Sequence, residues 1–197
     1  MRTVSRLFDD YDDAYKAVAA LKAAGIADSD ISVVANNVVN RHDRDGDGVD
    51  DRAEGAGAGA GVGATLGGAA GLLTGLGVMA IPGVGPVVAA GWLASTALGA
   101  LAGGAAGGVI GALTQAGVDE DDAHVYAEGV RRGGTLVTVR AEEDIAAGAE
   151  RILDQSAGVA AATRRGAYHE AGWSRFDETS PPLSREEIEA ERNRNSL

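Results

Sequence analysis

The chain has 197 residues, and its acidic residues outnumber the basic ones to give a formal net charge of −12. A nucleic-acid-binding protein needs a basic surface to neutralise phosphates, so we expect no nucleic-acid partner. No cysteine is present, which excludes disulfides, zinc–thiolate sites and cysteine nucleophiles and is typical of a reducing compartment.

The first 36 residues predict a strand, a helix and a second strand. Thr3–Phe8 is rich in strand-forming residues, and Asp9 and Asp10 are suited to the first turn of a helix that Gly25 ends. Ile31–Ala35 then predicts the second strand. The apolar residues of the predicted helix follow a helical period: Tyr11, Ala14, Val18 and Leu21.

An acidic linker, residues 37–54, contains the spacing of a twelve-residue EF-hand calcium loop. It departs from that family because Asp50 replaces an aliphatic residue, no clear helix precedes it and only one copy is present. The alternative is a solvated linker whose last acidic residues cap a following helix. The candidate Ca²⁺ ligands, the sole cofactor site that we expect, are Asp43, Asp45, Asp47, Val49 through its carbonyl, Asp51 and Glu54.

An uncharged block from Gly55 to Val118 divides the chain. Glycine recurs at every fourth residue from Gly55 to Gly75, and small residues resume this spacing from Gly91 to Gly111 after a Pro/Gly break at residues 81–86. Small residues four apart share one face of a helix and let two backbones approach closely. The spacing therefore predicts two helical arms packed as a Gly/Ala-rich α-helical hairpin.

The predicted hairpin could bury its outer, aliphatic sides either in a membrane or in the core of an oligomer. Each arm is long enough to cross a hydrocarbon core of about 30 Å, which favours a membrane. Most residues of the block are glycine or alanine, however, and acidic segments rather than Lys/Arg clusters flank it. The alternative is a homo-oligomer whose core buries the aliphatic faces of several hairpins. Assembled hairpins would also be compatible with a small channel.

The chain after the block repeats the order of elements seen at its start. Asp119–Asp122 begins a helix that continues to Arg132, and Thr135–Arg140 alternates as a half-buried strand does. A second helix opens at Asp144, with Ile145, Ala149 and Ile152 on one stripe, and ends near Gly158. Val159–Arg165 predicts a last strand.

Two β-α-β units in this order are the plan of a ferredoxin-like α+β domain, with the hairpin inserted between its second and third strands. Residues 1–36 and 119–166 form its halves, and residues 37–54 and 55–118 form the linker and the hairpin. Residues 167–197 are polar and contain Pro181-Pro182, so we expect a disordered tail.

No catalytic pattern emerges, so we expect neither an enzyme nor a small-molecule substrate. The glycine-rich block contains no G-x-G-x-x-G and no lysine for a P-loop. His42, His124 and His169 stand in unrelated contexts, without a serine or cysteine nucleophile at a recognisable spacing.

Three stretches resemble the general stress protein domain of bacterial heat-induced proteins. Phe8–Asp10 with its following helix is similar to the start of that domain, Ile81–Gly91 is similar to the glycine-zipper insert of many members, and Tyr126–Val137 resembles the helix and strand after it. The resemblance covers about residues 3–165. It implies a stress-induced, non-enzymatic bacterial protein associated with membranes, and it brings no catalytic residues.

We therefore expect a non-enzymatic general stress protein that presents its glycine-zipper hairpin for membrane association or self-assembly. The alternative is a soluble calcium-binding homo-oligomer with the hairpins packed in its core. No long apolar run follows Met1, so we expect no secretory signal peptide and a location in the cytoplasm or at the inner membrane.

Overall fold

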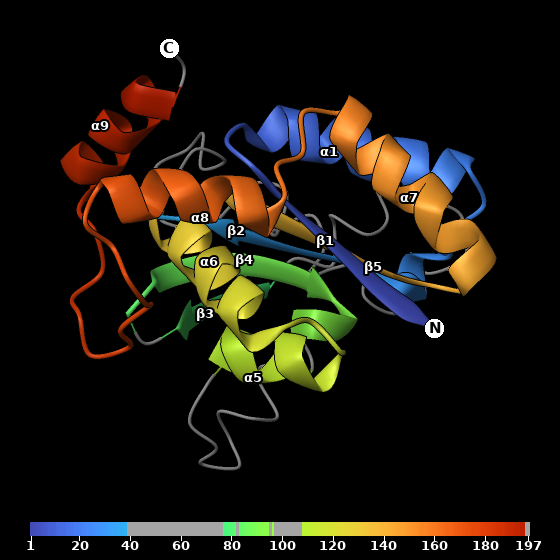
Figure 1. Ribbon diagram of the computed structural model, residues 1–197, viewed down its shortest axis with the longest axis horizontal. Coiled ribbons are helices and arrows are strands. Elements are labelled where there is room, and N and C mark those ends of the chain that lie inside the picture. The colour runs from blue at the N-terminus through green and yellow to red at the C-terminus, as the bar shows by residue number, and fades with distance from the viewer. Residues whose placement is uncertain (39–76, 82, 95, 97–107, 196–197) are drawn as a thin grey trace.

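The computed structural model describes residues 1–38, 77–81, 83–94, 96 and 108–195 (Figure 1). These residues form a five-stranded sheet, in the order β1-β5-β2-β4-β3, with helices on both faces. The predicted α+β class is confirmed. The strands are β1 (Arg2–Phe8), β2 (Ile31–Asn36), β3 (Gly77–Ile81), β4 (Gly85–Gly91) and β5 (Thr135–Ala141). The helices are α1 (Tyr11–Ala23), α5 (Gly108–Gln115), α6 (Glu120–Arg131), α7 (Glu143–Gln155), α8 (Ala161–Glu170), α9 (Arg185–Asn195) and the 3₁₀ turn η1 (Asp28–Asp30).

The centre of the sheet is β5, which pairs antiparallel with β1 on one side and with β2 on the other. Val139 lies opposite Val4 of β1 and opposite Ile31 of β2. Since β1 and β2 are both antiparallel to β5, they run parallel to each other with β5 between them. Helix α1 connects them, and α7 follows β5.

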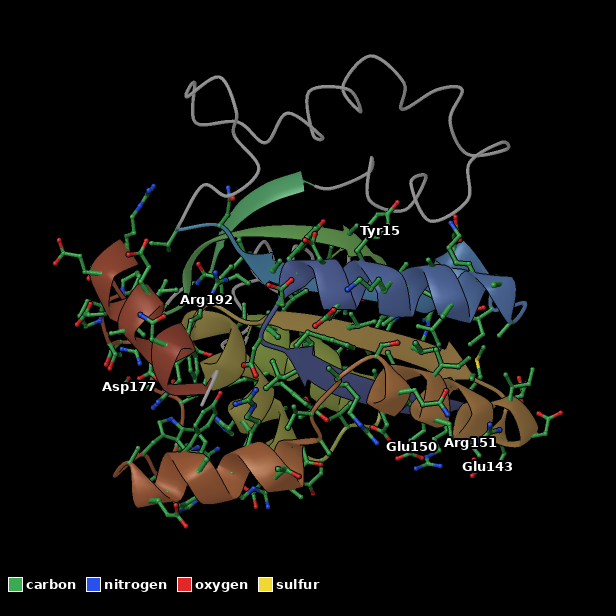
Figure 2. All side chains as sticks on the ribbon, turned by 90° about the horizontal axis from the view of Figure 1, so that it is seen from above. Tyr15, Glu143, Glu150, Arg151, Asp177 and Arg192 are labelled. Atoms are coloured by element: carbon green, nitrogen blue, oxygen red, sulfur yellow. The ribbon has the colours of Figure 1, made fainter. Side chains whose placement is uncertain are left out.

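One face of the sheet is covered by α1 and α7, which also contact each other. Asp10 caps α1 by accepting a hydrogen bond from the Asp12 N–H at 2.7 Å, and Gly25 follows the helix with φ +90°. The outer side of α7 carries Glu143 and Arg151 (Figure 2). The core of this face includes Val4, Phe8, Ala14, Val18, Leu21, Ile31, Val33, Val137, Val139, Ala146, Ala149 and Leu153.

The predicted apolar stripe of α7 is partly wrong. Ile145 is 47% exposed, whereas Ala146, Ala149 and Leu153 are buried. Alanine lets α7 lie close to the neighbouring α1, and Ile152 is only partly buried at the margin of this core. The prediction is right at Ala149, and the other two buried positions each lie one residue further along the helix than predicted.

The opposite face is covered by α5, α6 and α8 (Figure 1). Helix α6 begins as predicted, with the Asp119 carboxylate accepting hydrogen bonds from the N–H groups of Asp121 and Asp122. A Cβ at Gly129 would collide with the Leu7 side chain, so the glycine allows α6 to lie close against β1. The core of this face includes Leu7, Val34, Val87, Leu93, Val109, Leu113, Val125, Tyr126, Val130, Leu136, Tyr168 and Phe176.

The middle of the predicted helical hairpin is a β-hairpin instead. Strands β3 and β4 pair antiparallel around a tight turn in which the Val84 N–H donates to the Ile81 carbonyl at 3.1 Å and Gly83 has φ +74°. Valine and isoleucine flank this turn, and their β-branched side chains favour strands over helices. Gly91 belongs to the fourfold glycine spacing, but it lets β4 approach β2, since a Cβ there would collide with the Ile31 carbonyl oxygen.

The end of the predicted second arm is helical, as expected, but it packs into the domain. Val109, Ala112 and Leu113 of α5 are buried against α6. The remaining parts of the two predicted arms, residues 55–76 and 97–107, lie outside the described residues.

The predicted last strand, Val159–Arg165, is not formed. Val159 makes a single antiparallel bridge to Leu7, with backbone hydrogen bonds of 3.0 and 2.7 Å, and the chain then turns into α8. The three residues at positions 160–162 are alanines, which favour helix most strongly, and Arg164 of α8 forms an ion pair with Asp9.

The predicted disordered tail is also wrong for the described residues up to 195. Phe176 is 7% exposed and Ile188 of α9 is fully buried. A Cβ at Gly83 would lie 2.8 Å from the Asp177 carbonyl oxygen, and one at Gly133 would collide with Ile188. The tail is polar in composition, yet glycines on the domain leave room for its few apolar side chains.

Candidate functional site

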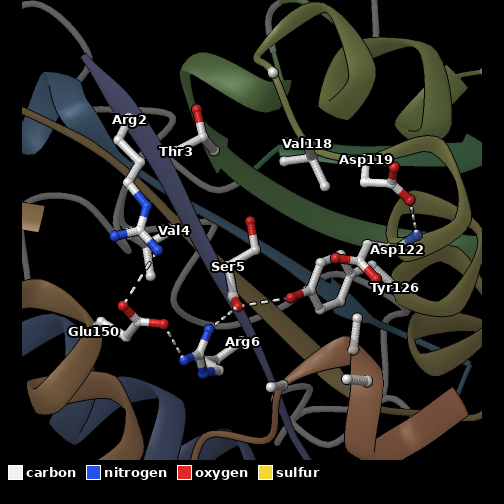
Figure 3. A pocket seen from close by; sticks show the side chains of 14 residues that line it. Arg2, Thr3, Val4, Ser5, Arg6, Val118, Asp119, Asp122, Tyr126 and Glu150 are labelled. Atoms are coloured by element: carbon white, nitrogen blue, oxygen red, sulfur yellow. Dashed lines mark hydrogen bonds and ion pairs between the residues drawn. The ribbon is translucent and has the colours of Figure 1, made fainter. Parts of the chain in front are cut away.

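A pocket of about 280 Å³ lies along the outer side of β1 (Figure 3). Strand β1 is at the edge of the sheet, since β5 is its one neighbouring strand among the described residues. The pocket is half open and mostly polar. It is lined by residues 2–6 of β1, residues 117–119, Asp122 and Tyr126 of α6, Glu150 of α7 and residues 160–162.

The bridge to Val159 shows which backbone groups of β1 face this pocket. The N–H and C=O groups of Leu7 point away from β5, because both bond to Val159. Backbone direction alternates along a strand, so the N–H and C=O groups of Thr3 and Ser5 point the same way, into the pocket. The intervening Val4 and Arg6 direct theirs towards β5.

Tyr126 closes one side of the pocket. Its ring comes from α6, and its hydroxyl donates a hydrogen bond of 2.8 Å to the Ser5 carbonyl oxygen (Figure 3). Burial raises the pKa of Tyr126 to about 12, although the nearby Arg6 opposes this rise. The phenol therefore stays protonated at neutral pH and acts as a hydrogen-bond donor at the strand edge.

Two arginines of β1 approach α7 on the other side of the pocket. Arg6 bonds Glu150 at 2.8 Å, Asp154 at 2.6 Å and the Ser5 carbonyl oxygen at 3.0 Å. Burial alone would lower the pKa of Arg6, but the hydrogen bonds to Asp154 and Glu150 raise it above its ordinary value. Arg2 reaches the same Glu150 at 3.4 Å, and its side chain is 46% exposed. Glu150 is thus shared between two guanidinium groups.

The α6 side of the pocket is acidic. The Asp119 carboxylate caps α6, and Asp122 pairs with Arg165 of α8. The pKa of Asp122 is raised, mainly by burial and also by the neighbouring Asp119 and Asp121 carboxylates, although Arg165 opposes this rise. The pocket therefore has a side with two arginines and a side with two aspartates, separated by the backbone edge of β1.

The residue types of the pocket offer limited chemistry. No histidine, cysteine or lysine lines it, and the Ser5 hydroxyl donates to Thr138 across the strand pair at 3.2 Å. The carboxylates that line the pocket already have partners: Asp119 caps α6, Asp122 pairs with Arg165, and Glu150 is shared by Arg2 and Arg6. The arrangement provides hydrogen-bond donors and acceptors of fixed position, which suits binding.

The candidate calcium ligands Asp43, Asp45, Asp47, Val49, Asp51 and Glu54 all lie outside the described residues. Elsewhere, within the described parts of the chain, no three His, Asp or Glu side chains gather as a metal site would require. Of the three histidines, His42 is outside the described residues, His169 is exposed on α8 and His124 is buried on α6. Burial lowers the pKa of His124, and Arg175 lowers it further.

Sequence reasoning missed the pocket because its residues are far apart in the chain. Arg2 and Arg6 give a visible signal, since two arginines four residues apart in a strand point to one face. Nothing near them in sequence indicates that Glu150 or Tyr126 lies beside them.

Comparisons with protein-family models, with curated proteins and with solved structures find no match. The resemblance to general stress proteins therefore stays a prediction. Among the helices of the described residues, none combines the length and the apolar character needed to cross a bilayer.

Proposed function

We propose that the protein is a non-enzymatic interaction protein of the general stress type, whose ferredoxin-like core presents the glycine-rich segment 55–76 for self-assembly. The observation that carries this proposal is the way the sheet holds both ends of the insertion between β2 and β3. The insertion leaves the sheet after Asn36 and re-enters it at Gly77.

The two ends of the insertion are close together. Asn36 lies opposite Val87 of β4, and Val87 lies opposite Met79 of β3. Two strand spacings across the sheet and two residues along it put Asn36 and Gly77 about 12 Å apart. The two ends of the insertion are therefore held close together in the sheet of the domain.

This anchoring favours self-assembly over a membrane-spanning hairpin. One crossing of the hydrocarbon core would separate the two ends by about 30 Å, and two crossings need roughly 40 apolar residues. The uncharged part of the insertion, residues 55–76, is long enough for about one crossing. Its small-residue period suits close packing against the same segment of another copy.

The ferredoxin-like assignment is supported by the order of elements around β5. Strand β1, α1 and β2 form one split β-α-β unit, and β5, α7 and Val159 begin a second one. The hairpin β3–β4 extends the sheet beyond β2. We interpret the core as ferredoxin-like, with its fourth strand reduced to the Val159 bridge.

The acidic loop from Asp43 to Glu54 directly precedes the glycine-rich segment in sequence. We propose it as a Ca²⁺ site that influences assembly, because its spacing provides the oxygen ligands that Ca²⁺ prefers. The full chain is therefore to be tested with Ca²⁺ and with EDTA.

Sedimentation of the full chain over a range of concentrations tests self-assembly. We expect oligomers, and we expect the double variant Gly63→Leu/Gly67→Leu to weaken them because leucine blocks close approach of the small-residue face. The matched control Gly61→Leu/Gly68→Leu makes the same chemical change off this face. A wild-type monomer at every concentration, or equal effects of both variants, contradicts the proposal.

Two further arms complete this experiment. A Ca²⁺-dependent change in oligomer size that EDTA reverses supports the acidic loop as a metal site, and the absence of any change at millimolar Ca²⁺ removes that part. Flotation of the chain with liposomes, resistant to an alkaline carbonate wash, would favour membrane insertion instead.

A further inference from the structure

We propose that the pocket along β1 is a strand-addition site, at which an extended peptide segment of a partner protein pairs with the sheet. This inference does not depend on the glycine-rich segment. It rests on the backbone of β1, the Val159 bridge and the charges on the two sides of the pocket.

The open edge has its own pattern of hydrogen-bonding groups. The N–H and C=O groups of Leu7 both form hydrogen bonds with the backbone of Val159. The Ser5 carbonyl oxygen accepts hydrogen bonds from the Tyr126 hydroxyl and the Arg6 guanidinium. The Ser5 N–H and both backbone groups of Thr3 point to the same side, and no described residue pairs with them in a strand ladder. A strand edge of this kind is a template for one more strand.

Val159 begins that additional strand but does not continue it. An antiparallel partner continuing from the Leu7–Val159 bridge would place its next residues beside Ser5 and Thr3. The chain instead bends into α8 at Ala161, and the space left beside β1 is the 280 Å³ pocket. The vacant position lies beside β1, next to the Val159 bridge at which the predicted strand Val159–Arg165 would have begun.

The charges on the two sides indicate what an added strand would carry. Side chains of an added strand alternate between the α7 side and the α6 side. On the α7 side, Arg2 is half exposed and shares Glu150 with Arg6, so a partner carboxylate can pair with it. On the α6 side, Asp119, Asp122 and the Tyr126 ring disfavour acidic or bulky residues. The fitting ligand is an extended peptide that alternates acidic and small polar residues.

The probe is an acetylated, amidated hexapeptide in which glutamate and threonine alternate, added to the full-length protein. We expect hydrogen exchange of the Thr3 and Ser5 amides to slow when the peptide is added. We also expect the same peptide with lysine in place of glutamate to bind about tenfold more weakly, since it loses the pairing with Arg2.

A pair of variants isolates the backbone contribution. Thr3→Pro removes the N–H that faces the pocket without removing a hydrogen bond between β1 and β5, so we expect about tenfold weaker peptide binding. Thr3→Ala also loses the hydroxyl bond to the Ala116 carbonyl but keeps the N–H, and we expect it to bind like the wild type. A melting curve for each variant establishes that it is folded.

Three outcomes overturn the proposal. They are unchanged exchange of the Thr3 and Ser5 amides at millimolar peptide, equal binding by Thr3→Pro and Thr3→Ala, and protection of these amides that depends on protein concentration alone. The last result would identify a second copy of this chain as the occupant. If Thr3→Pro does not fold, the exchange measurement on the wild type decides the question.

Discussion

The two faces of the sheet are covered by helices that reach their places in different ways. On the first face, α1 directly follows β1 and α7 directly follows β5, and each helix contacts both of these strands. On the second face, α5 and α6 precede β5, whereas α8 and the tail with Phe176 follow α7. Each helix of the first face thus directly follows a strand that it covers, whereas α8 and the tail reach the second face from beyond the last strand.

The two faces also differ in the residue types that their cores bury. The first face buries residues at helical spacing against an alternating sheet, for example Val18 and Leu21 against Val33 and Val137. The second face has close approaches at Gly129 and Gly133, as the first face has at Gly158, and adds a fully buried charge at Glu128. We expect substitutions at these special positions to cost more than matched changes on the first face.

The largest expected effect is that of Glu128→Ala. The Glu128 carboxylate is 1% exposed and bonds Arg132 at 2.7 Å and Arg131 at 3.3 Å. Its removal leaves two partly buried guanidinium groups without this partner, so the free energy of unfolding should fall by about 3–5 kcal/mol. Urea denaturation measures this loss of stability.

The control is Glu143→Ala, at an exposed position of α7, which should change the free energy of unfolding by no more than about 0.5 kcal/mol. Equal losses for the two variants would contradict a special role of the buried Glu128 carboxylate.

A smaller loss is expected for Gly91→Ala. Gly91 has φ +86°, and a Cβ there would collide with backbone of β2. Strain and collision together should cost about 3 kcal/mol. Gly25→Ala is the matched control, because Gly25 has φ +90° but nothing within 4 Å of a Cβ. It should cost about 1 kcal/mol by urea denaturation, and similar losses at both sites would show that close approach at Gly91 is unimportant.

The smallest effect belongs to the tail. Ile188 is fully buried beside Gly133, and Ile188→Ala should lower stability by about 2 kcal/mol because a terminal helix can adjust around the cavity. Ile145→Ala makes the same change at a residue that is 47% exposed on the first face and should cost less than about 1 kcal/mol. Thermal melts compare the two variants. An unchanged melting temperature for Ile188→Ala would indicate that α9 contributes nothing to the fold.

The contrast between the faces also explains what the sequence could predict. The strands and helices of the first face follow apolar periods and capping residues such as Asp10 and Gly25, so both β1-α1-β2 and α7 were expected. The fourfold glycine spacing suggested helix, but Gly91 serves strand packing, a long-range contact that no local pattern reveals. Ile188 was missed because one apolar residue in a polar segment gives no periodic signal.

The pocket along β1 illustrates the same limit. Its walls come from residues 2–6, 117–119, 122, 126, 150 and 160–162, which meet through the pairing of β1 with β5. The calcium-like spacing from Asp43 to Glu54 is local and therefore easy to find in the sequence. These residues lie outside the described ones, and Ca²⁺ titration of the full chain tests the prediction.

The central position of β5 has a consequence for folding during synthesis. Strands β1 and β2 share no hydrogen-bonded register and are joined through β5, which begins at Thr135. Pairing across such long sequence separations slows folding, because loop-closure entropy must be lost first. A nascent chain ending before β5 therefore lacks the middle of its sheet while its uncharged glycine-rich stretch has already left the ribosome. We expect this stage to need chaperone protection most, before the last third of the chain arrives.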